Sequence, residues 1–366
     1  MATPRPPFWP RATALFAVAL AFRLALLAVA LGWSRQPLDT FLVRSDAPSY
    51  VALARVLLGE GRPETVWHER VYWGWPLAFA PLGRALPLVG ACVAAGVLWA
   101  SLVPPLFYAL TRHFRLAALL TVFPPTWLMH SCMGMSEAVY LAALLLGAWA
   151  MLSGRTALSG GAVALAVLVR PTAVFVAAGL ALVLVRRRRW GALAGWSALC
   201  LIGPAATVAL NVRYYGEWDR QARLHGAPIN VPPEALRALA PDGQTRTYFC
   251  APFEALVKTP LVLPTPKWKV AFVYAHVLAV LLATALAVWH ARRSELDLVI
   301  GVWALLNTCF IVSTGPYWGF HSFDRYCVWG LPAYLYAARG LLPRREAFDG
   351  LLAAASFALA AWGMTH

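Results

Sequence analysis

The chain has 366 residues, of which 60% are hydrophobic and only 13% carry a charged side chain. Soluble globular domains carry about 25% charged residues, so this composition excludes an ordinary soluble domain. The formal net charge of +15 is typical of basic cytoplasmic loops and of contact with anionic membrane lipids, and we expect no nucleic-acid partner.

Apolar stretches of about 20 residues, the length that an α-helix needs to cross a bilayer, recur along the whole chain. They are continuous rather than alternating, so we predict an all-α polytopic membrane protein and not a β-barrel. Arg23 interrupts the first stretch and no small-residue cleavage site follows it, which favours a retained anchor over a signal peptide. The eleven predicted helices span residues 12–33, 89–110, 116–131, 135–152, 157–169, 172–185, 191–212, 270–289, 297–314, 325–341 and 348–364.

Short basic links between these helices predict the orientation of the single membrane domain, residues 1–366. With eleven spans all of these links fall on one side, which the positive-inside rule assigns to the cytoplasm. Two long segments, residues 34–88 and 213–269, then lie on the outer side. The basic residues concerned are Arg5, Arg11, Arg112, Arg115, Arg155, Arg186 to Arg189, Arg292, Arg293, Arg344 and Arg345.

The first outer segment contains the stretch RSDAPSYVALA, residues 44–54. Ser45 can cap a helix that starts at Asp46, and Tyr50 then shares an apolar face with Leu53. This pattern predicts a short amphipathic helix on the outer membrane surface, with Asp46 at its N-terminal end. Asp46 alone could do no more than help to cap this helix.

The stretch WHERVYWGWPLAFAPLGRAL, residues 67–86, follows in the same outer segment. Its aromatic residues are typical of a membrane-interface belt. Beside His68, Glu69 and Arg70, they also suit a rim that stacks on sugars and binds phosphate. The local pattern leaves both interpretations open.

Three later stretches place polar side chains at predicted outer ends of helices. FPPTWLMHSCMGMSEAVYLAALL, residues 123–145, carries His130 and Glu137, and a glutamate at a helix start is also favoured by the helix dipole. LVRPTAVF places Arg170 at the next outer turn. GPYWGFHSFDRYCVWGLPAY, residues 315–334, contributes His321, Asp324 and Arg325, where Arg325 could simply pair with Asp324 or reach toward the interface.

Little in the sequence favours a metal or a disulfide framework. The six cysteines are scattered and form no CxxC pattern. Glu217-Trp218-Asp219 has the spacing of a weak metal motif, but polar loops contain such spacings by chance. We therefore expect no metal and no cofactor.

Several of these stretches occur in the order seen in GT-C membrane glycosyltransferases. The chain is most similar to the bacterial PIG-V-like relatives of the enzyme that adds the second mannose to GPI anchors. The resemblance covers about residues 12–340, with Ala173 where glycine is usual and Ser45 where tryptophan is usual, in a chain that is short for the family. It is carried by DAPSYVALA, WGWPLAFAPLGRAL, FPPTWLMHSCMGMSEAVYLAALL, LVRPTAVF, YYGEWDRQARLHG and RYCVWGLPAYLY.

The resemblance implies a GT-C bundle that transfers a sugar, mannose in the family, from a polyprenyl-phosphate carrier with inversion. The acceptor is a hydroxyl of a glycan, lipid or protein at the extracytoplasmic face of the bacterial cytoplasmic membrane. Asp46 matches the family's general base, and Glu137 and His130 would line the donor sugar or support Asp46. The candidates for binding the donor phosphate or sugar are Arg170, Arg325, His321, Glu137, His130, Tyr50, His68 and Arg70, with Arg213 as a weaker one.

Two other classes of function stay open at this point. A transporter or lipid-linked-sugar flippase usually carries acidic residues near the middle of its helices and often shows inverted repeats. Here Arg23 is the only central charge, and no repeat is visible. A non-catalytic subunit of a glycan-assembly complex is the other alternative, and the retained Asp46 argues against it.

Overall fold

The computed structural model describes residues 8–35, 37–38, 46–61, 63, 65–226, 233–239, 249–315, 317–343 and 345–365. Within these residues the protein is all-helical, apart from an isolated bridge between Phe249 and Thr314. The longer helices are α1 (Phe8–Ser34), α5 (Leu88–Thr111), α8 (Glu137–Leu152), α9 (Thr156–Val169), α10 (Val174–Arg186), α11 (Trp190–Cys200), α12 (Ile202–Tyr215), α16 (Lys267–His290), α17 (Glu295–Val312) and α21 (Glu346–Thr365). The shorter ones are α3 (Ala47–Leu57), η1 (Val66–Arg70), α4 (Gly74–Phe79), η2 (Ala80–Arg84), α6 (Phe114–Val122), α7 (Pro125–Cys132), η3 (Pro171–Ala173), α13 (Arg220–Gly226), α14 (Pro233–Leu239), α15 (Glu254–Val262), α18 (Trp318–His321), α19 (Phe323–Val328), α20 (Leu331–Ala337) and η5 (Ala338–Gly340).

Six helical segments of the described chain are long and apolar enough to cross a membrane: α1, α5, α11 together with α12, α16, α17 and α21. A seventh is added if α7 and α8, which are bent by 108° at their junction, count as one span. Their outward faces are apolar, as at Leu278 on α16 and Leu351 on α21, which are about 70% exposed. The chain is therefore a multi-pass membrane protein, while the count of eleven spans stays a prediction.

Each of the eleven predicted stretches falls on helix, but three of them are interrupted. Pro124 and Pro125 separate α6 from α7, because proline lacks the N–H that a helix needs and disfavours helix in the residue before it. Pro204 likewise removes the bond to the Cys200 carbonyl where α11 gives way to α12. Gly330 and Pro332 divide the predicted helix 325–341 into α19 and α20.

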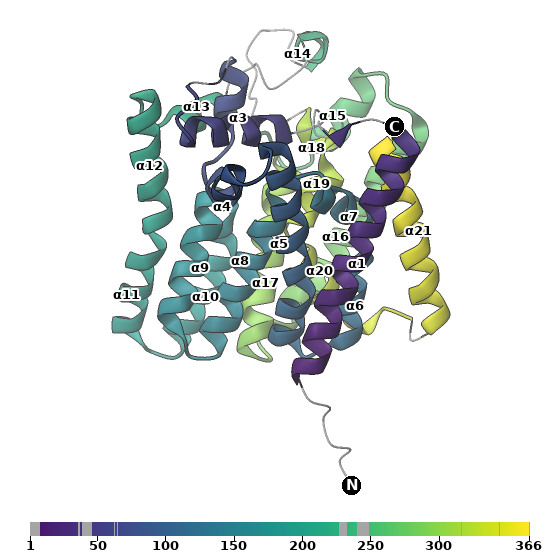
Figure 1. The fold of residues 1–366 in the computed structure, drawn as a ribbon. Coiled ribbons are helices and arrows are strands. Elements are labelled where there is room, and N and C mark those ends of the chain that lie inside the picture. The colour runs from purple at the N-terminus through teal and green to yellow at the C-terminus, as the bar shows by residue number, and fades with distance from the viewer. Residues whose placement is uncertain are drawn as a thin grey trace.

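The longer helices stand side by side, and several of the short elements lie at one end of them (Figure 1). This upper end in Figure 1 carries α3, α13, α14, α15 and α18, so the described parts of both long segments, 34–88 and 213–269, lie at the same end. The start of α1 and the basic links after α8, α10 and α16 lie at the opposite, lower end. The described part of the chain agrees with the predicted separation of basic links from long segments; Arg5 and Arg344 lie outside it.

Two tryptophans of the stretch 67–86, Trp73 and Trp75, have neither of the two roles that the sequence predicted, a membrane-interface belt or a sugar-binding rim. Trp73 and Trp75 are fully buried in the core. The Trp73 indole donates to Asn211 Oδ1 at 2.8 Å, and the Trp75 indole donates to the Gly134 carbonyl at 2.7 Å. Between them, Gly74 lies so close to α9 that a Cβ would be 2.5 Å from the Val169 nitrogen. These two indoles are neither an interface belt nor a sugar platform, because the Trp73 indole joins α4 to α12 and the Trp75 indole joins it to the turn between α7 and α8.

Candidate functional site

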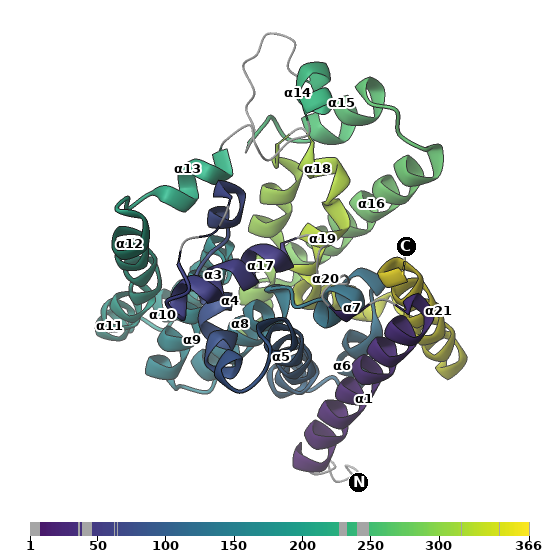
Figure 2. The same cartoon turned by 45° about the horizontal axis from the view of Figure 1, so that its top comes forward.

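The upper end contains a cavity of about 590 Å³ between α3, η1, the α9–η3 junction, the end of α17 and the α18–α19 pair. The view from above in Figure 2 shows α3, α18 and α19 meeting around the end of α17. Seven of the nine predicted site residues line this cavity: Asp46, Tyr50, Arg70, His130, Arg170, His321 and Arg325. Glu137 and His68 are not among the lining residues.

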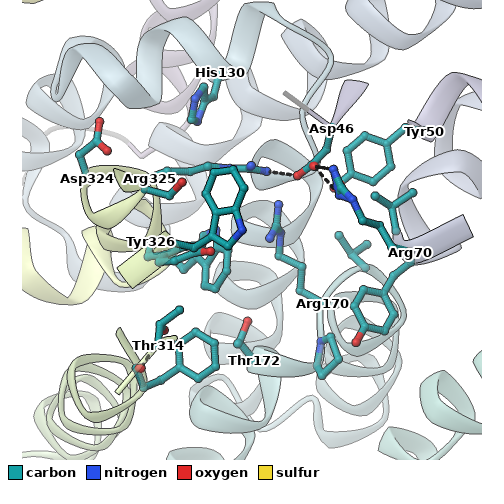
Figure 3. A pocket seen from close by; sticks show the side chains of 18 of the residues that line it. Asp46, Tyr50, Arg70, His130, Arg170, Thr172, Thr314, Asp324, Arg325 and Tyr326 are labelled. Carbon is teal, nitrogen blue, oxygen red and sulfur yellow. Dashed lines mark hydrogen bonds and ion pairs between the residues drawn. The ribbon is translucent and has the colours of Figure 1, made fainter. Parts of the chain in front are cut away.

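Asp46 occupies the N-cap position of α3, but its side chain makes no capping hydrogen bond. Its carboxylate accepts instead from two guanidinium groups (Figure 3). Arg70 donates to Oδ1 at 2.9 and 2.5 Å, and Arg325 donates to Oδ2 at 2.6 Å. The alternative that Asp46 only caps the helix is therefore wrong. Ser45, the predicted cap, lies outside the described residues.

The ion pairs continue on the far side of Arg325. Its Nε donates to Glu137 Oε1 at 2.8 Å, and Arg170 Nη2 donates to the same oxygen at 2.9 Å. Five side chains of alternating charge thus form one continuous series, which we call the ion-pair row: Arg70, Asp46, Arg325, Glu137 and Arg170. Arg325 does not pair with Asp324, whose Oδ2 accepts from the Thr126 hydroxyl at 2.8 Å.

Local sequence explains how Arg170 and Glu137 meet. Pro171 disfavours helix at the residue before it, so Arg170 ends α9 in an extended conformation (φ −154°, ψ 128°). Its guanidinium then reaches Ser136 Oγ at 2.7 Å as well as Glu137, the first residue of α8. Ala173 has a φ of −56°, so the glycine usual in the family is not needed there for backbone reasons.

Tyr50 joins the row from α3. Its hydroxyl is 2.8 Å from Ser136 Oγ, so Ser136 connects Tyr50 with Arg170. Burial raises the pKa of Tyr50 to about 12, and the phenol is therefore protonated at neutral pH. Ser136 was not predicted, although it directly precedes Glu137 in the sequence.

The charge of Asp46 is strongly stabilised by its partners. Burial alone raises the pKa of this carboxyl, but the positive charges of Arg325 and Arg70 outweigh burial and hold the pKa well below its usual range. The group is thus an anion at physiological pH. With both oxygens bonded to guanidinium groups, it attracts a further proton only weakly.

Glu137 supports the row from behind the cavity wall. Its side chain is fully buried, and its Oε2 makes no hydrogen bond within the described chain. We expected Glu137 to line the donor sugar or to support Asp46. The observed position favours the second of these roles, through Arg325.

His321 lines the cavity as a neutral ring. Burial and the nearby charge of Lys269 lower the pKa of His321 to about 4. The Lys269 ammonium lies 3.0 Å from Nδ1, so Nδ1 accepts this hydrogen bond and Nε2 carries the proton. The cation next to His321 is therefore Lys269, which the sequence did not single out and which is not among the lining residues, and His321 itself is neutral.

The two other predicted histidines differ in position. His130 is 7% exposed, lines the cavity and leaves Nδ1 without a hydrogen-bond partner among the described residues. His68 is turned toward α3, where its Nδ1 is 3.0 Å from Ser49 Oγ. His68 thus helps to pack η1 on α3 and does not face the cavity. Arg213 also lies away from it, over the Tyr214 ring.

Aromatic and hydroxyl side chains complete the cavity wall. Trp329 lies 4.5 Å from the Arg170 guanidinium in a cation–π contact. Thr172 and Thr314 lie across the cavity from Asp46 (Figure 3). Further aromatic lining comes from Tyr72, Phe310, Trp318 and Tyr326. Aromatic faces and hydroxyl groups of this kind are suited to holding a sugar ring.

The Glu217-Trp218-Asp219 spacing has another explanation. Glu217 pairs with Arg220 and Arg223, and Asp219 lies 3.2 Å from Arg223. Among the described residues no group of three or more His, Cys, Asp or Glu side chains could hold a metal ion. The six cysteines are all free.

In comparisons with known proteins, no family model and no curated protein matches the chain. The resemblance to GT-C glycosyltransferases therefore depends on the motifs of the sequence alone.

Proposed function

We propose that the protein is an inverting glycosyltransferase that takes a sugar from a polyprenyl-phosphate carrier and uses Asp46 as its general base. One observation carries this proposal: the aspartate expected to be the base lies on the wall of a cavity, bonded to two of the arginines expected to bind phosphate. Five sequence segments, each singled out for its own motif, meet at this one place.

The reaction has a simple balance of atoms. The oxygen of an acceptor hydroxyl forms a bond to the anomeric carbon, and the bond from that carbon to the phosphate oxygen breaks. The hydroxyl proton passes to the Asp46 carboxylate, and polyprenyl phosphate leaves with its electron pair. A phosphate leaving group needs charge neutralisation and no protonation, which the arginines of the row can supply. One carboxylate suffices, because inversion needs no covalent intermediate.

The ion-pair row fits a donor with a single negative charge. Arg70, Arg170 and Arg325 face Asp46 and Glu137, so the row has one positive charge in excess. A sugar linked to a lipid through one phosphate is a phosphodiester with one negative charge. Binding of this anion neutralises the excess.

Donor binding also explains how Asp46, a weak base in the free protein, can act as the general base. A phosphate that accepts hydrogen bonds from Arg70 or Arg325 competes with the carboxylate for the same donors. As these bonds shift to the phosphate, the pKa of Asp46 rises toward its usual range, and the carboxylate becomes a better base. The base is thus activated only when the donor is in place.

The arrangement of charges supports a surface reaction rather than transport. In the six candidate spans, acidic residues occur only in the first turns of α17 and α21. The cavity lies at the end that holds both long segments, opposite the basic links (Figure 1). With the positive-inside rule this end is extracytoplasmic. We retain the GT-C bundle of about eleven spans in the bacterial cytoplasmic membrane as part of the proposal.

The test is transfer by the purified protein. Wild type and Asp46→Asn are incubated with membrane extract and a panel of labelled polyprenyl-phosphate sugars, mannose first. We expect a labelled product with wild type and none with the variant. Transfer of comparable rate by a well-folded Asp46→Asn protein would overturn the proposal. Movement of intact donor across proteoliposomes without transfer would point to the flippase alternative.

A further inference from the structure

The second long segment contacts the first beside the phosphate-binding arginines. Arg220, the first residue of α13, donates through Nε to Glu69 Oε2 at 2.8 Å, and its Nη2 lies 2.7 Å from the same oxygen. The next residue, Gln221, donates to the Val71 carbonyl at 2.8 Å. Consecutive residues of α13 therefore hold the residues on either side of Arg70.

Arg70 needs this outside support. It ends η1, a 3₁₀-helix of five residues that no side-chain hydrogen bond caps at its N-terminus. Such short 3₁₀ segments have poor hydrogen-bond geometry and little stability of their own. Yet the Arg70 guanidinium is fixed against Asp46 Oδ1, and the residue is only 8% exposed.

The contacts on the two sides of η1 are both buried. Glu69 is 6% exposed and Gln221 is 1% exposed, so these bonds are shielded from water. Arg220 is itself held by Glu217 at 3.2 Å. Arg223, one turn further along α13, pairs with Glu217 and Asp219, and no hydrogen bond or ion pair of it with η1 occurs among the described residues.

We propose that Arg220 and Gln221 are positioning residues that hold Arg70 in its phosphate-binding place through Glu69 and Val71. The second long segment thereby controls how tightly the site binds the anionic part of the donor. The phosphate part of this inference depends on the proposed function, whereas the support of η1 by α13 does not.

The experiment compares Arg220→Gln and Glu69→Gln with Arg223→Gln, which removes a neighbouring charge from the same helix. Hydrogen exchange over residues 66–72 reports the support itself. We expect faster exchange in Arg220→Gln and Glu69→Gln, and wild-type exchange in Arg223→Gln. Unchanged exchange in the first two variants would overturn the support of η1, whatever the protein's reaction.

Binding of radiolabelled undecaprenyl phosphate to the detergent-solubilised protein reports the consequence. Arg70→Gln should weaken binding at least about thirtyfold, because it removes a charged hydrogen-bonding partner from a buried group. Arg220→Gln and Glu69→Gln should each weaken it about tenfold through misplacement of Arg70. The double variant should be no weaker than either, since both changes break one contact.

Two further results decide whether Arg220 acts as a positioning residue. Exchanging the charges, as Glu69→Arg with Arg220→Glu, should restore binding if the pair acts by holding η1. If hydrogen exchange in η1 is faster in Arg220→Gln but undecaprenyl phosphate binds as in wild type, the positioning role is overturned. Wild-type binding in Arg70→Gln would instead count against the phosphate assignment of the proposed function. The hydrogen-exchange rates of residues 66–72 would still decide whether α13 supports η1.

Discussion

Two groups of arginines and carboxylates lie close together at the upper end of this protein, and they differ mainly in burial. The ion-pair row has side chains that are 0–17% exposed, and all of its members except Glu137 line a cavity. The α13 group, formed by Glu217, Asp219, Arg220 and Arg223, has side chains that are 24–54% exposed. Exposed pairs contribute little to stability, whereas removing one partner of a buried pair leaves an uncompensated charge. The same residue types therefore form the site itself in one place and, in the other, an exposed group of which only Arg220 reaches toward the site, through Glu69.

The largest expected effect tests the row as a catalytic group. Asp46→Asn should lower the transfer rate about a thousandfold, the range of general-base catalysis. The variant should still fold and insert, because the amide oxygen can accept from either arginine. Initial transfer rates and melting temperatures, both measured for each variant, separate loss of chemistry from loss of folding. An Asp219→Asn protein serves as the control from the exposed group and should keep the wild-type rate.

The second effect tests burial directly. Glu137→Gln removes the shared acceptor of Arg170 and Arg325 in a fully buried position. It should lower the free energy of unfolding by about 3 kcal/mol, as expected for one partner of a buried ion pair. Glu217→Gln, the matched change in the exposed group, should leave the melting curve unchanged. Equal losses of unfolding free energy in the two variants would show that burial does not distinguish the two groups.

A smaller effect concerns His321 at the edge of the same cavity. Its pKa is about 4 in the folded protein and about 6.5 in an unfolded chain, so the unfolded state binds more protons between these values. Stability should therefore fall as the pH drops from about 6.5 to about 4. Melting temperatures at pH 7.5 and 5 should show this decrease in wild type and a smaller decrease in His321→Gln. Identical pH profiles would show that His321 is not held neutral.

The smallest expected effect is that of chelation. The carboxylates of Glu217 and Asp219 are occupied by Arg220 and Arg223, so chelators should leave transfer unchanged. The measurement is the transfer rate before and after treatment with a chelator. A loss that added metal restores would contradict this prediction and would reopen the Glu217–Asp219 spacing as a candidate metal site.

Periodicity and composition predicted the positions of the helices well, because apolar runs of this length are visible without tertiary information. The motifs predicted the members of the row one by one. The sequence could not show that they alternate in one chain, since Asp46 and Arg325 are 279 positions apart. Lys269 was missed for the same reason, because nothing near it in the sequence indicates His321.

The breaks in the helices and the buried tryptophans show a second limit. Proline was visible at each break, yet proline is tolerated in many membrane helices, so its effect depends on the surrounding packing. Trp73 and Trp75 have the composition of an interface belt. Their burial depends on Gly74, whose missing side chain allows close contact with α9.

The 279 positions between Asp46 and Arg325 also bear on how the protein is made. Asp46 and Glu137 leave the ribosome long before Arg325, so the growing chain contains acidic groups whose final partner does not yet exist. Until then Asp46 can pair with Arg70 and Glu137 with Arg170, but the second oxygen of Asp46 needs water as its partner. The half-made bundle therefore has to stay open at this end, and truncated chains that stop before residue 325 should be early targets for membrane proteases.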